Sequence, residues 1–182
     1  MCRPEPGRGR GGAFEGDHEH DAGRRAKAGR ASTAAGEPAR GGKTYPATTN
    51  NLVEGEVEYA RNPPTNGNHS PTWQNCGFYS EPIDKKTAVH SLDHGVVWIT
   101  YRPGLPADQI EQLRPYGDEE YVIVSPYPDL PAPVVATAWR NQIHLEGPND
   151  PRLREFVDEF RISELTPLSG NRCVGGIGQP DA

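Results

Sequence analysis

The chain has 182 residues, of which 34% are hydrophobic, and a formal net charge of −6 at pH 7. This length allows one ordinary domain with a hydrophobic core, but 21 glycines and 19 prolines indicate that part of the chain does not pack. No stretch approaches the run of about 20 apolar residues that a membrane span requires, and the start of the chain lacks the apolar segment of a secretory signal. These features argue against a membrane span in this chain.

Residues 1–43 form a low-complexity segment rich in glycine, alanine and arginine. They contain a single aromatic residue, Phe14, and no Ile, Leu or Val, so they cannot bury enough apolar surface to offset the entropy lost on ordering. We predict a disordered tail over residues 1–43 and one domain over residues 44–182. A leader of this composition is equally consistent with a misplaced start of the chain.

The charge differs between the predicted tail and the predicted domain. The tail carries +3 and the remainder −9. Phosphate contacts need clustered basic side chains, so the acidic balance argues against a nucleic-acid-binding domain. In the tail, acidic residues stand among the arginines, which favours a solvated, nonspecific segment. His18 and His20 could hold a metal there only loosely, because ordering the tail costs entropy.

The domain is predicted to start with one strand and a long loop. Residues 52–59 alternate apolar and acidic side chains, a period of two that is typical of a half-exposed strand. Residues 62–82 contain four prolines, and Trp73, Phe78 and Tyr79 favour an ordered loop because such a loop buries its aromatic residues.

The rest of the domain alternates helices and strands. The clearest helix starts at Asp150, a capping residue followed by a proline, and has its apolar residues on one face. The residues between the strands of the second half include a proline-rich connection, and the last two strands form either a hairpin or one bent strand. The predicted elements are helices over 85–94, 107–114 and 150–161, and strands over 96–101, 121–125, 134–139 and 142–145. This order predicts an α+β fold, a mixed sheet with helices packed mainly on one side and a long ordered proline-rich loop.

Three histidines stand in two distinctive stretches, His69 in residues 62–69 (NPPTNGNH) and the other two in residues 89–95 (VHSLDHG). An extended chain would separate the Cα atoms of His90 and His94 by about 13 Å, whereas a helical turn brings them to about 6 Å on one face. A shared metal ion therefore requires a helix. Three imidazoles and a water would suit zinc or copper, with Asp93 orienting a ligand or binding directly.

The residues leave other roles open for these histidines. A pair spaced four apart occurs often by chance, and a capping or hydrogen-bonding role at a helix end is the alternative to metal binding. A nucleophilic triad of Ser91, His90 and Asp93 is disfavoured, because neighbouring residues point in different directions and no nucleophile-elbow motif is present. Metal-dependent hydrolysis would need an open coordination position and a general base, for which only Asp93 is at hand. His144 lies in a strand pattern that favours a solvent-facing or internally hydrogen-bonded side chain over a metal ligand.

None of the three cysteines, Cys2, Cys76 and Cys173, has the spacing of a cysteine zinc knuckle. Cys76 and Cys173 lie in glycine-rich sequence at opposite ends of the domain, where a disulfide would close a loop of roughly 100 residues and contribute about 4–5 kcal/mol in the chain-entropy model. Two free thiols in a reducing compartment are the alternative, and the residues do not decide between them.

Several stretches, in this order along the chain, resemble the mainly bacterial domain-of-unknown-function family 3105 (DUF3105) over residues 50–180. They are residues 62–69, 73–77 (WQNCG), 89–95 continuing into 96–101 (VVWITY), 125–128 (SPYP), 130–131 (LP), 134–139 (VVATAW) and 173–176 (CVGG). Family members usually have Ser where this chain has Asn66, and Glu where it has Asp93. The shorter aspartate makes direct ligation less expected at that position than at the histidines.

The resemblance implies a location and a set of positions but no reaction. Members commonly carry an N-terminal membrane anchor and are expected outside the cytoplasmic membrane, which favours a disulfide between Cys76 and Cys173. This chain shows no signal or anchor, so a cytoplasmic location stays open. We expect an extracytoplasmic domain that binds copper or zinc through His69, His90 and His94. The alternatives are a non-enzymatic structural or protein-interaction module and, last, a metal-dependent hydrolase; no partner or oligomeric state follows from the sequence.

Overall fold

A computed structural model describes residues 40–181. The predicted tail lies outside these residues except for its last four, of which Lys43 begins the first strand. Cys2, His18 and His20 also lie outside the described residues. Within residues 40–181, no helix is both long and apolar enough to cross a membrane.

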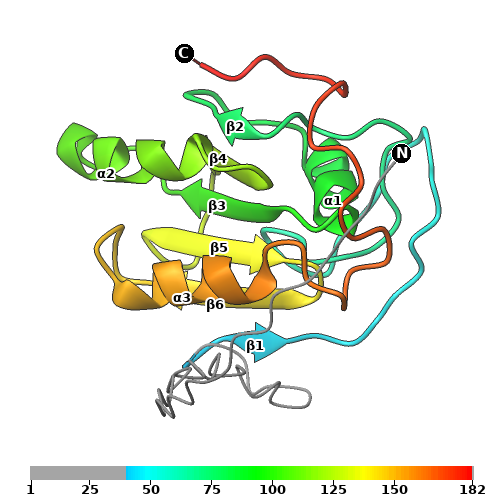
Figure 1. Cartoon of the computed structure of the whole chain (residues 1–182), viewed down its shortest axis with the longest axis horizontal. Coiled ribbons are helices and arrows are strands. Elements are labelled where there is room, and N and C mark those ends of the chain that lie inside the picture. Colours follow the sequence, from blue (N-terminus) through cyan, green and yellow to red (C-terminus); the bar gives the residue numbers. More distant parts are fainter. Residues whose placement is uncertain (1–39, 182) are drawn as a thin grey trace, which may run out of the picture. The chain divides into compact units, whose positions relative to one another are not determined.

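The described residues form one mixed sheet and three helices, the predicted α+β fold (Figure 1). The strand order is β1-β6-β5-β3-β4-β2, in which β3, β4 and β2 run parallel and the other neighbours run antiparallel. The elements are β1 (Lys43–Thr44), β2 (Gly77–Phe78), α1 (Lys85–Asp93), β3 (Val97–Tyr101), α2 (Ala107–Gly117), β4 (Val122–Pro126), β5 (Val134–Ala138), β6 (Asn141–Leu145) and α3 (Pro151–Phe160).

Local sequence explains where the helices begin and end. The side chain of Asp84 accepts a hydrogen bond from the backbone N–H of Lys86 at 2.6 Å and so caps α1. Asp150 caps α3 in the same way. Gly95, at φ +97°, ends the α1 turn in a conformation that glycine adopts without strain. The last two strands form a hairpin, with Arg140 at φ +65° in its tight turn.

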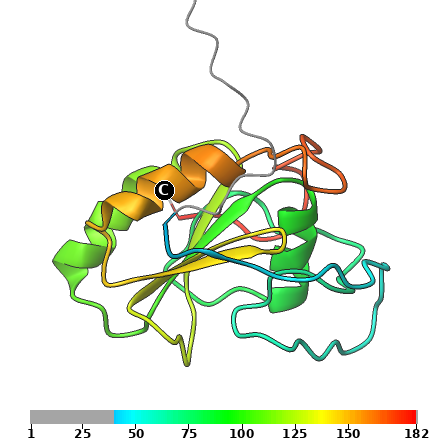
Figure 2. The same cartoon turned by 90° about the horizontal axis from the view of Figure 1, so that it is seen from below.

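Chain topology places α1 and α2 on opposite faces of the sheet. The crossover from β2 through α1 to β3 and the crossover from β3 through α2 to β4 join parallel strands but run in opposite directions across the sheet. Because such crossovers are almost always right-handed, opposite directions put the two helices on opposite faces. Figure 2 shows this arrangement, with α3 on the same side as α2. Two of the three helices thus share one side, as predicted.

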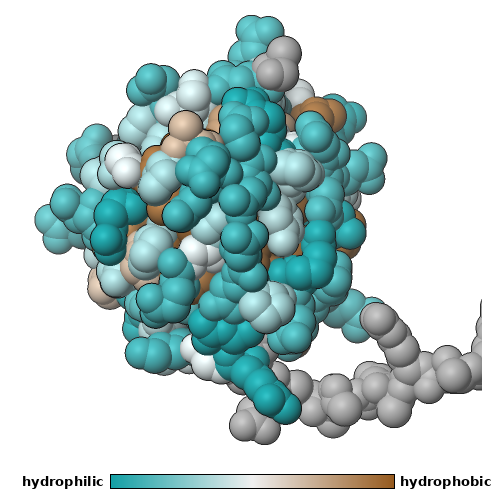
Figure 3. Space-filling view, turned by 90° about the vertical axis from the view of Figure 1, so that its left-hand side faces the viewer, coloured by the Kyte–Doolittle hydropathy of each residue, from teal (hydrophilic) through white to brown (hydrophobic). Residues whose placement is uncertain are grey.

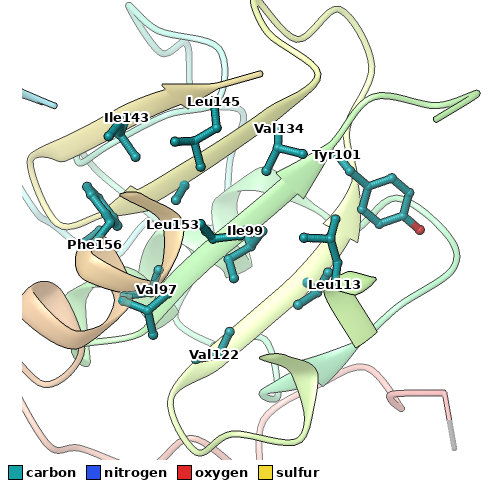
Figure 4. Close-up of a cluster of buried hydrophobic side chains, with 14 of the residues drawn as sticks. Val97, Ile99, Tyr101, Leu113, Val122, Val134, Ile143, Leu145, Leu153 and Phe156 are labelled. Atoms are coloured by element: carbon teal, nitrogen blue, oxygen red, sulfur yellow. The ribbon is translucent and has the colours of Figure 1, made fainter. Parts of the chain in front are cut away.

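Each face of the sheet has its own hydrophobic cluster. On the first face, side chains of α2 and α3 pack against side chains of β3 to β6, as Figure 4 shows. This cluster includes Leu113, Leu153, Phe156, Val97, Ile99, Val122, Val134, Ile143 and Leu145. On the second face, α1 covers the other side of the same strands; this cluster includes Ala88, Val89, Leu92, Trp98, Ile123, Val135 and Trp139. In the view of Figure 3, the described surface is mainly hydrophilic, with hydrophobic side chains in small separate areas.

The strand predicted over residues 52–59 is wrong. Only Leu52 makes a β-bridge, to His69, and the chain beyond it runs outside the sheet. Val53, Val57 and Tyr59 are half-buried while the acidic residues between them are exposed. The alternation therefore reflects a segment that packs one side against the rest of the protein but has no strand partners.

The loop over residues 62–82 is ordered, as its aromatic residues indicated. Phe78 and Tyr79 are buried, and the Asn62–Pro63 peptide bond is cis. The loop also contains β2, which the sequence did not predict because two residues are too few to display a period of two. β1 escaped prediction for the same reason.

Candidate functional site

The three predicted histidines lie together at the end of α1. His90 is in the last turn of the helix and His94 is its C-cap, so one helical turn separates them on one face. The imidazole centroids of His69 and His90 are 4.8 Å apart, and those of His90 and His94 are 4.5 Å apart. All three side chains are buried, with exposed fractions of 1%, 4% and 3% for His69, His90 and His94.

Main-chain contacts hold the loop that carries His69 against α1. The N–H of Ser70 donates to the carbonyl of Lys86 at 3.3 Å, and the N–H of Gln74 donates to the carbonyl of Thr87 at 3.2 Å. Deeper in the interface, the hydroxyl of Ser91 donates to the carbonyl of Gln74 at 2.8 Å and accepts from its N–H at 3.0 Å. The proline-rich loop is therefore fixed to the helix next to the histidines.

Each of the three imidazoles has its Nδ1 next to a main-chain carbonyl oxygen. The distances are 2.9 Å from His69 to Gly67, 2.7 Å from His90 to Ser70 and 2.8 Å from His94 to Arg172. A carbonyl oxygen can only accept a hydrogen bond, so each Nδ1 carries the proton and the Nε2 of each neutral ring has a free lone pair.

The Nε2 atoms of His90 and His94 face each other at 3.0 Å. With both Nδ1 atoms protonated, this distance brings two lone pairs together unless a proton or an ion lies between them. Burial lowers the pKa of His90 to about 4, and the neighbouring imidazoles add to this effect. Burial also lowers the pKa of His94, against the opposing effects of the Arg172 carbonyl and Asp93. Burial thus disfavours a positively charged imidazolium at either position.

Asp93 is buried beside this pair, with an exposed fraction of 2%. Burial raises the pKa of its carboxyl, an effect that a hydrogen bond from Asn50 and the nearby imidazoles of His69 and His94 partly oppose. One carboxyl oxygen, Oδ1, has no hydrogen-bond partner within residues 40–181. This oxygen is therefore not tied to any of the imidazoles.

Trp73 is a site residue that the sequence did not reveal. Its ring lies 5.7 Å from that of His90 and 5.3 Å from that of His94, measured between centroids. The two histidines and Trp73 line an open hollow of about 360 Å³, together with Leu168, Asn171 and Arg172. The histidine pair is therefore at the base of a surface depression. From sequence, Trp73 could only be assigned to the loop, because nothing in its spacing relates it to α1.

Cys76 and Cys173 form a disulfide, with their Cα atoms 5.4 Å apart. The bond joins the proline-rich loop to the C-terminal segment that carries Arg172. The sequence left two free thiols as the alternative, and family resemblance favoured the bond that is found.

Within residues 40–181, no group of three or more histidine, cysteine, aspartate or glutamate side chains is arranged to hold a metal ion. The ring of His69 contacts that of His90, but the three histidines do not form such a group. The metal site of three histidines accordingly stays a prediction. Chemically, the arrangement offers two neutral imidazoles with facing lone pairs, a third close by and an opening to the surface.

A family model described as "Protein of unknown function (DUF3105)" matches residues 52–175. The matched range contains the three histidines, Trp73 and both cysteines of the disulfide. No match was found among curated proteins or among solved structures.

Proposed function

The chain belongs to the DUF3105 family, and we propose that its domain is a non-enzymatic, extracytoplasmic module that binds one copper or zinc ion. The ion would be held by the Nε2 atoms of His90 and His94, with His69 as the third protein ligand. The observation that carries this proposal is the 3.0 Å approach of the two Nε2 atoms while both Nδ1 atoms point at carbonyl oxygens.

Without an ion, the two Nε2 lone pairs repel each other, and each way of removing this repulsion costs free energy. If one ring moved its proton to Nε2, its Nδ1 lone pair would face the carbonyl of Ser70 or Arg172. If one ring took a second proton, a charge would be buried, which the lowered pKa values of both histidines oppose. A metal ion satisfies both lone pairs and leaves the carbonyl contacts in place.

The geometry lies close to what an ion requires. Two imidazole nitrogens bound to a tetrahedral zinc at 2.0–2.1 Å would be about 3.3 Å apart, a small opening from the observed 3.0 Å. A metal-bound histidine normally donates its other N–H to a carbonyl or carboxylate, which fixes the tautomer. The Nδ1 contacts of His90 and His94 supply such partners in advance.

The remaining ligands have candidates in the surroundings of the pair. The Nδ1 of His69 is also bonded to a carbonyl, which would leave its Nε2 free for an ion. A fourth ligand, a water or an incoming group, could reach the ion from the hollow that Trp73 and the two histidines line. Asp93 supports the site as a buried negative charge when it is ionised.

The disulfide supports the proposed location. Bonds of this kind persist in secreted, periplasmic and cell-surface proteins and are rare in the reducing cytosol. The expected compartment does not depend on whether a metal binds.

Two other functions receive less support. In a purely structural or protein-interaction module, the same carbonyl contacts would fix the loop on α1 without an ion, but the facing Nε2 atoms would then have no partner. A metal-dependent hydrolase would need a base facing the open position. The described residues that line the hollow include no carboxylate, and Asp93 is 2% exposed.

The test is metal content of the untagged full chain in a background of His18→Ala and His20→Ala, which removes the two histidines of the predicted tail. After equilibration with copper or zinc and removal of free ion, plasma mass spectrometry should find about one equivalent per chain. His90→Ala and His94→Ala should each lose it. The matched control is His144→Ala, which removes an exposed histidine of β6 and should retain the ion.

Thermal unfolding gives a second measurement. An ion at a hundred times its dissociation constant stabilises the folded state by about 2.7 kcal/mol, which should raise the melting temperature of the parent and not that of His94→Ala. A folded parent with no bound ion and no thermal shift would sink the metal proposal. A loss of stability in His94→Ala under those conditions would favour the structural module.

A further inference from the structure

We propose that the Cys76–Cys173 disulfide is a redox latch on the histidine site. Its reduction would release the C-terminal strap, defined as residues 168–178, and with it the carbonyl that fixes the imidazole of His94. The consequence for metal affinity rests on the proposed function, whereas the release of His94 does not.

The strap closes over the end of α1 through three hydrogen bonds. The Nδ1–H of His94 donates to the carbonyl of Arg172 at 2.8 Å. The N–H of Gly170 donates to the carbonyl of His94 at 3.0 Å, and the N–H of Leu168 donates to the carbonyl of Asp93 at 3.0 Å. The strap therefore supplies the outer partner of one proposed ligand and the cap of its helix.

A second set of bonds joins the strap to the proline-rich loop. The N–H of Cys76 donates to the carbonyl of Cys173 at 2.8 Å, and the N–H of Asn75 donates to the carbonyl of Ile177 at 2.8 Å. In return, the N–H of Ile177 donates to the carbonyl of Trp73 at 2.9 Å. Figure 1 shows this segment, in red, running past α1 to the C-terminus.

Apolar packing does little to hold the strap in place. Val174 is 67% exposed, Leu168 is 48% exposed and Ile177 is 46% exposed. Segments with few buried apolar contacts and solvent-exposed backbone hydrogen bonds open at low free energy. The covalent bond one residue from Arg172 is therefore the strongest tie between the strap and the loop.

A reductant can reach the disulfide. Both cysteines are partly exposed, and they line an open hollow of about 390 Å³ with Tyr121 and Val174. The thiolate of a dithiol would attack one sulfur and form a mixed disulfide, which the second thiol of the dithiol resolves. The bond takes up two electrons and two protons to give two thiols, while the dithiol is oxidised to its own disulfide.

Release of the strap would leave the Nδ1 of His94 without its carbonyl. The ring could then rotate or move its proton to Nε2, and both changes withdraw a lone pair from the ion. Loss of such an outer partner typically lowers metal affinity by 10–100-fold. The latch would thus keep the ion under oxidising conditions and release it to a reducing partner.

The experiment compares the oxidised full chain with a Cys76→Ser/Cys173→Ser variant, both carrying Cys2→Ser to remove the third thiol. The first measurement is made without metal, by NMR of ¹⁵N-labelled histidine, with His94→Ala to assign the His94 signal. Exchange of the His94 Nδ1–H should become about tenfold faster or more in the double variant, as expected for a local opening. The Nδ1–H signals of His69 and His90 should keep their exchange rates. Copper or zinc affinity, from competition titration, should fall by 10–100-fold.

A matched control and two outcomes that would contradict the proposal complete the experiment. Val174→Ala, which removes an exposed side chain from the same strap, should change neither measurement. An unchanged His94 signal, or equal loss of all three histidine signals, would overturn the latch. Release of His94 in a protein that binds no metal would support the latch and reject the proposed metal function. If the double variant does not fold, the same signals are followed while dithiothreitol reduces the parent, where His94 should lose protection first.

Discussion

The two faces of the sheet are closed in different ways. α2 and α3 close the first face with apolar side chains on regular helices, as in Figure 4. The second face combines α1 with the proline-rich loop and the strap, and beside its apolar cluster it buries three histidines, Asp93 and Ser91. A buried polar group needs a partner, and the carbonyls within helices and strands are already bonded. Irregular segments have free carbonyls, which Gly67, Ser70 and Arg172 offer to the three imidazoles.

We infer that the first face mainly provides stability and the second mainly positions the site. The largest expected effect comes from Phe156→Ala, which truncates a fully buried side chain on the first face. Its loss should lower the free energy of unfolding by about 3–5 kcal/mol, because the removed ring leaves a cavity. Urea unfolding measures this change. The matched control, Leu165→Ala, removes a side chain that is 69% exposed and should stay within about 0.5 kcal/mol.

The metal content of the same variant shows whether the first face affects stability alone or also the histidine site. If it affects stability alone, the folded fraction of Phe156→Ala keeps the metal stoichiometry of the parent. A loss of bound ion in protein that is still folded would break the distinction, since the first face would then also shape the site.

A smaller effect is expected where the loop meets α1. Ser91→Ala removes a hydroxyl that is hydrogen-bonded to both the N–H and the carbonyl of Gln74. Ser91 is 1% exposed, so these contacts are buried. Leaving these buried groups with fewer partners should lower the free energy of unfolding by about 1–3 kcal/mol. Denaturant unfolding would measure it, with the exposed Ser80→Ala as the matched control. An effect no larger than that of Ser80→Ala would mean that the loop is held without this contact.

Much of the first face could be predicted from the sequence. The helix that begins at Asp150 was marked by its cap, its proline and its apolar side, and the structure has it over Pro151–Phe160. The strands with continuous apolar runs were found for a similar reason. These sequence patterns are local. Local patterns are enough to predict helices and strands whose buried side chains recur with a fixed period.

The second face was predictable only in part. A spacing of four on a helix predicted that His90 and His94 would lie together, and they do. The position of α1 depends on the crossover from β2, a strand of two residues with no pattern to find. The carbonyls of Ser70 and Arg172 could not be foreseen, because every residue has a carbonyl and only the path of the chain selects one. Trp73 reaches the histidines through the same unpredictable path.

The smallest expected effect tests whether metal binding depends on the position of a histidine or only on the number of histidines in the chain. His144 lies on β6, opposite Val135 of β5, and its side chain is exposed, as its strand pattern indicated. His144→Ala removes the same chemical group as His94→Ala, but no buried contact and no partner near α1. Its free energy of unfolding should stay within about 0.5 kcal/mol of the parent, and its bound metal should be unchanged. Both quantities come from the thermal unfolding and metal measurements already described. If the loss of metal were as large as in His94→Ala, binding would follow the number of histidines in the chain, and the buried pair at the end of α1 would have no special part in it.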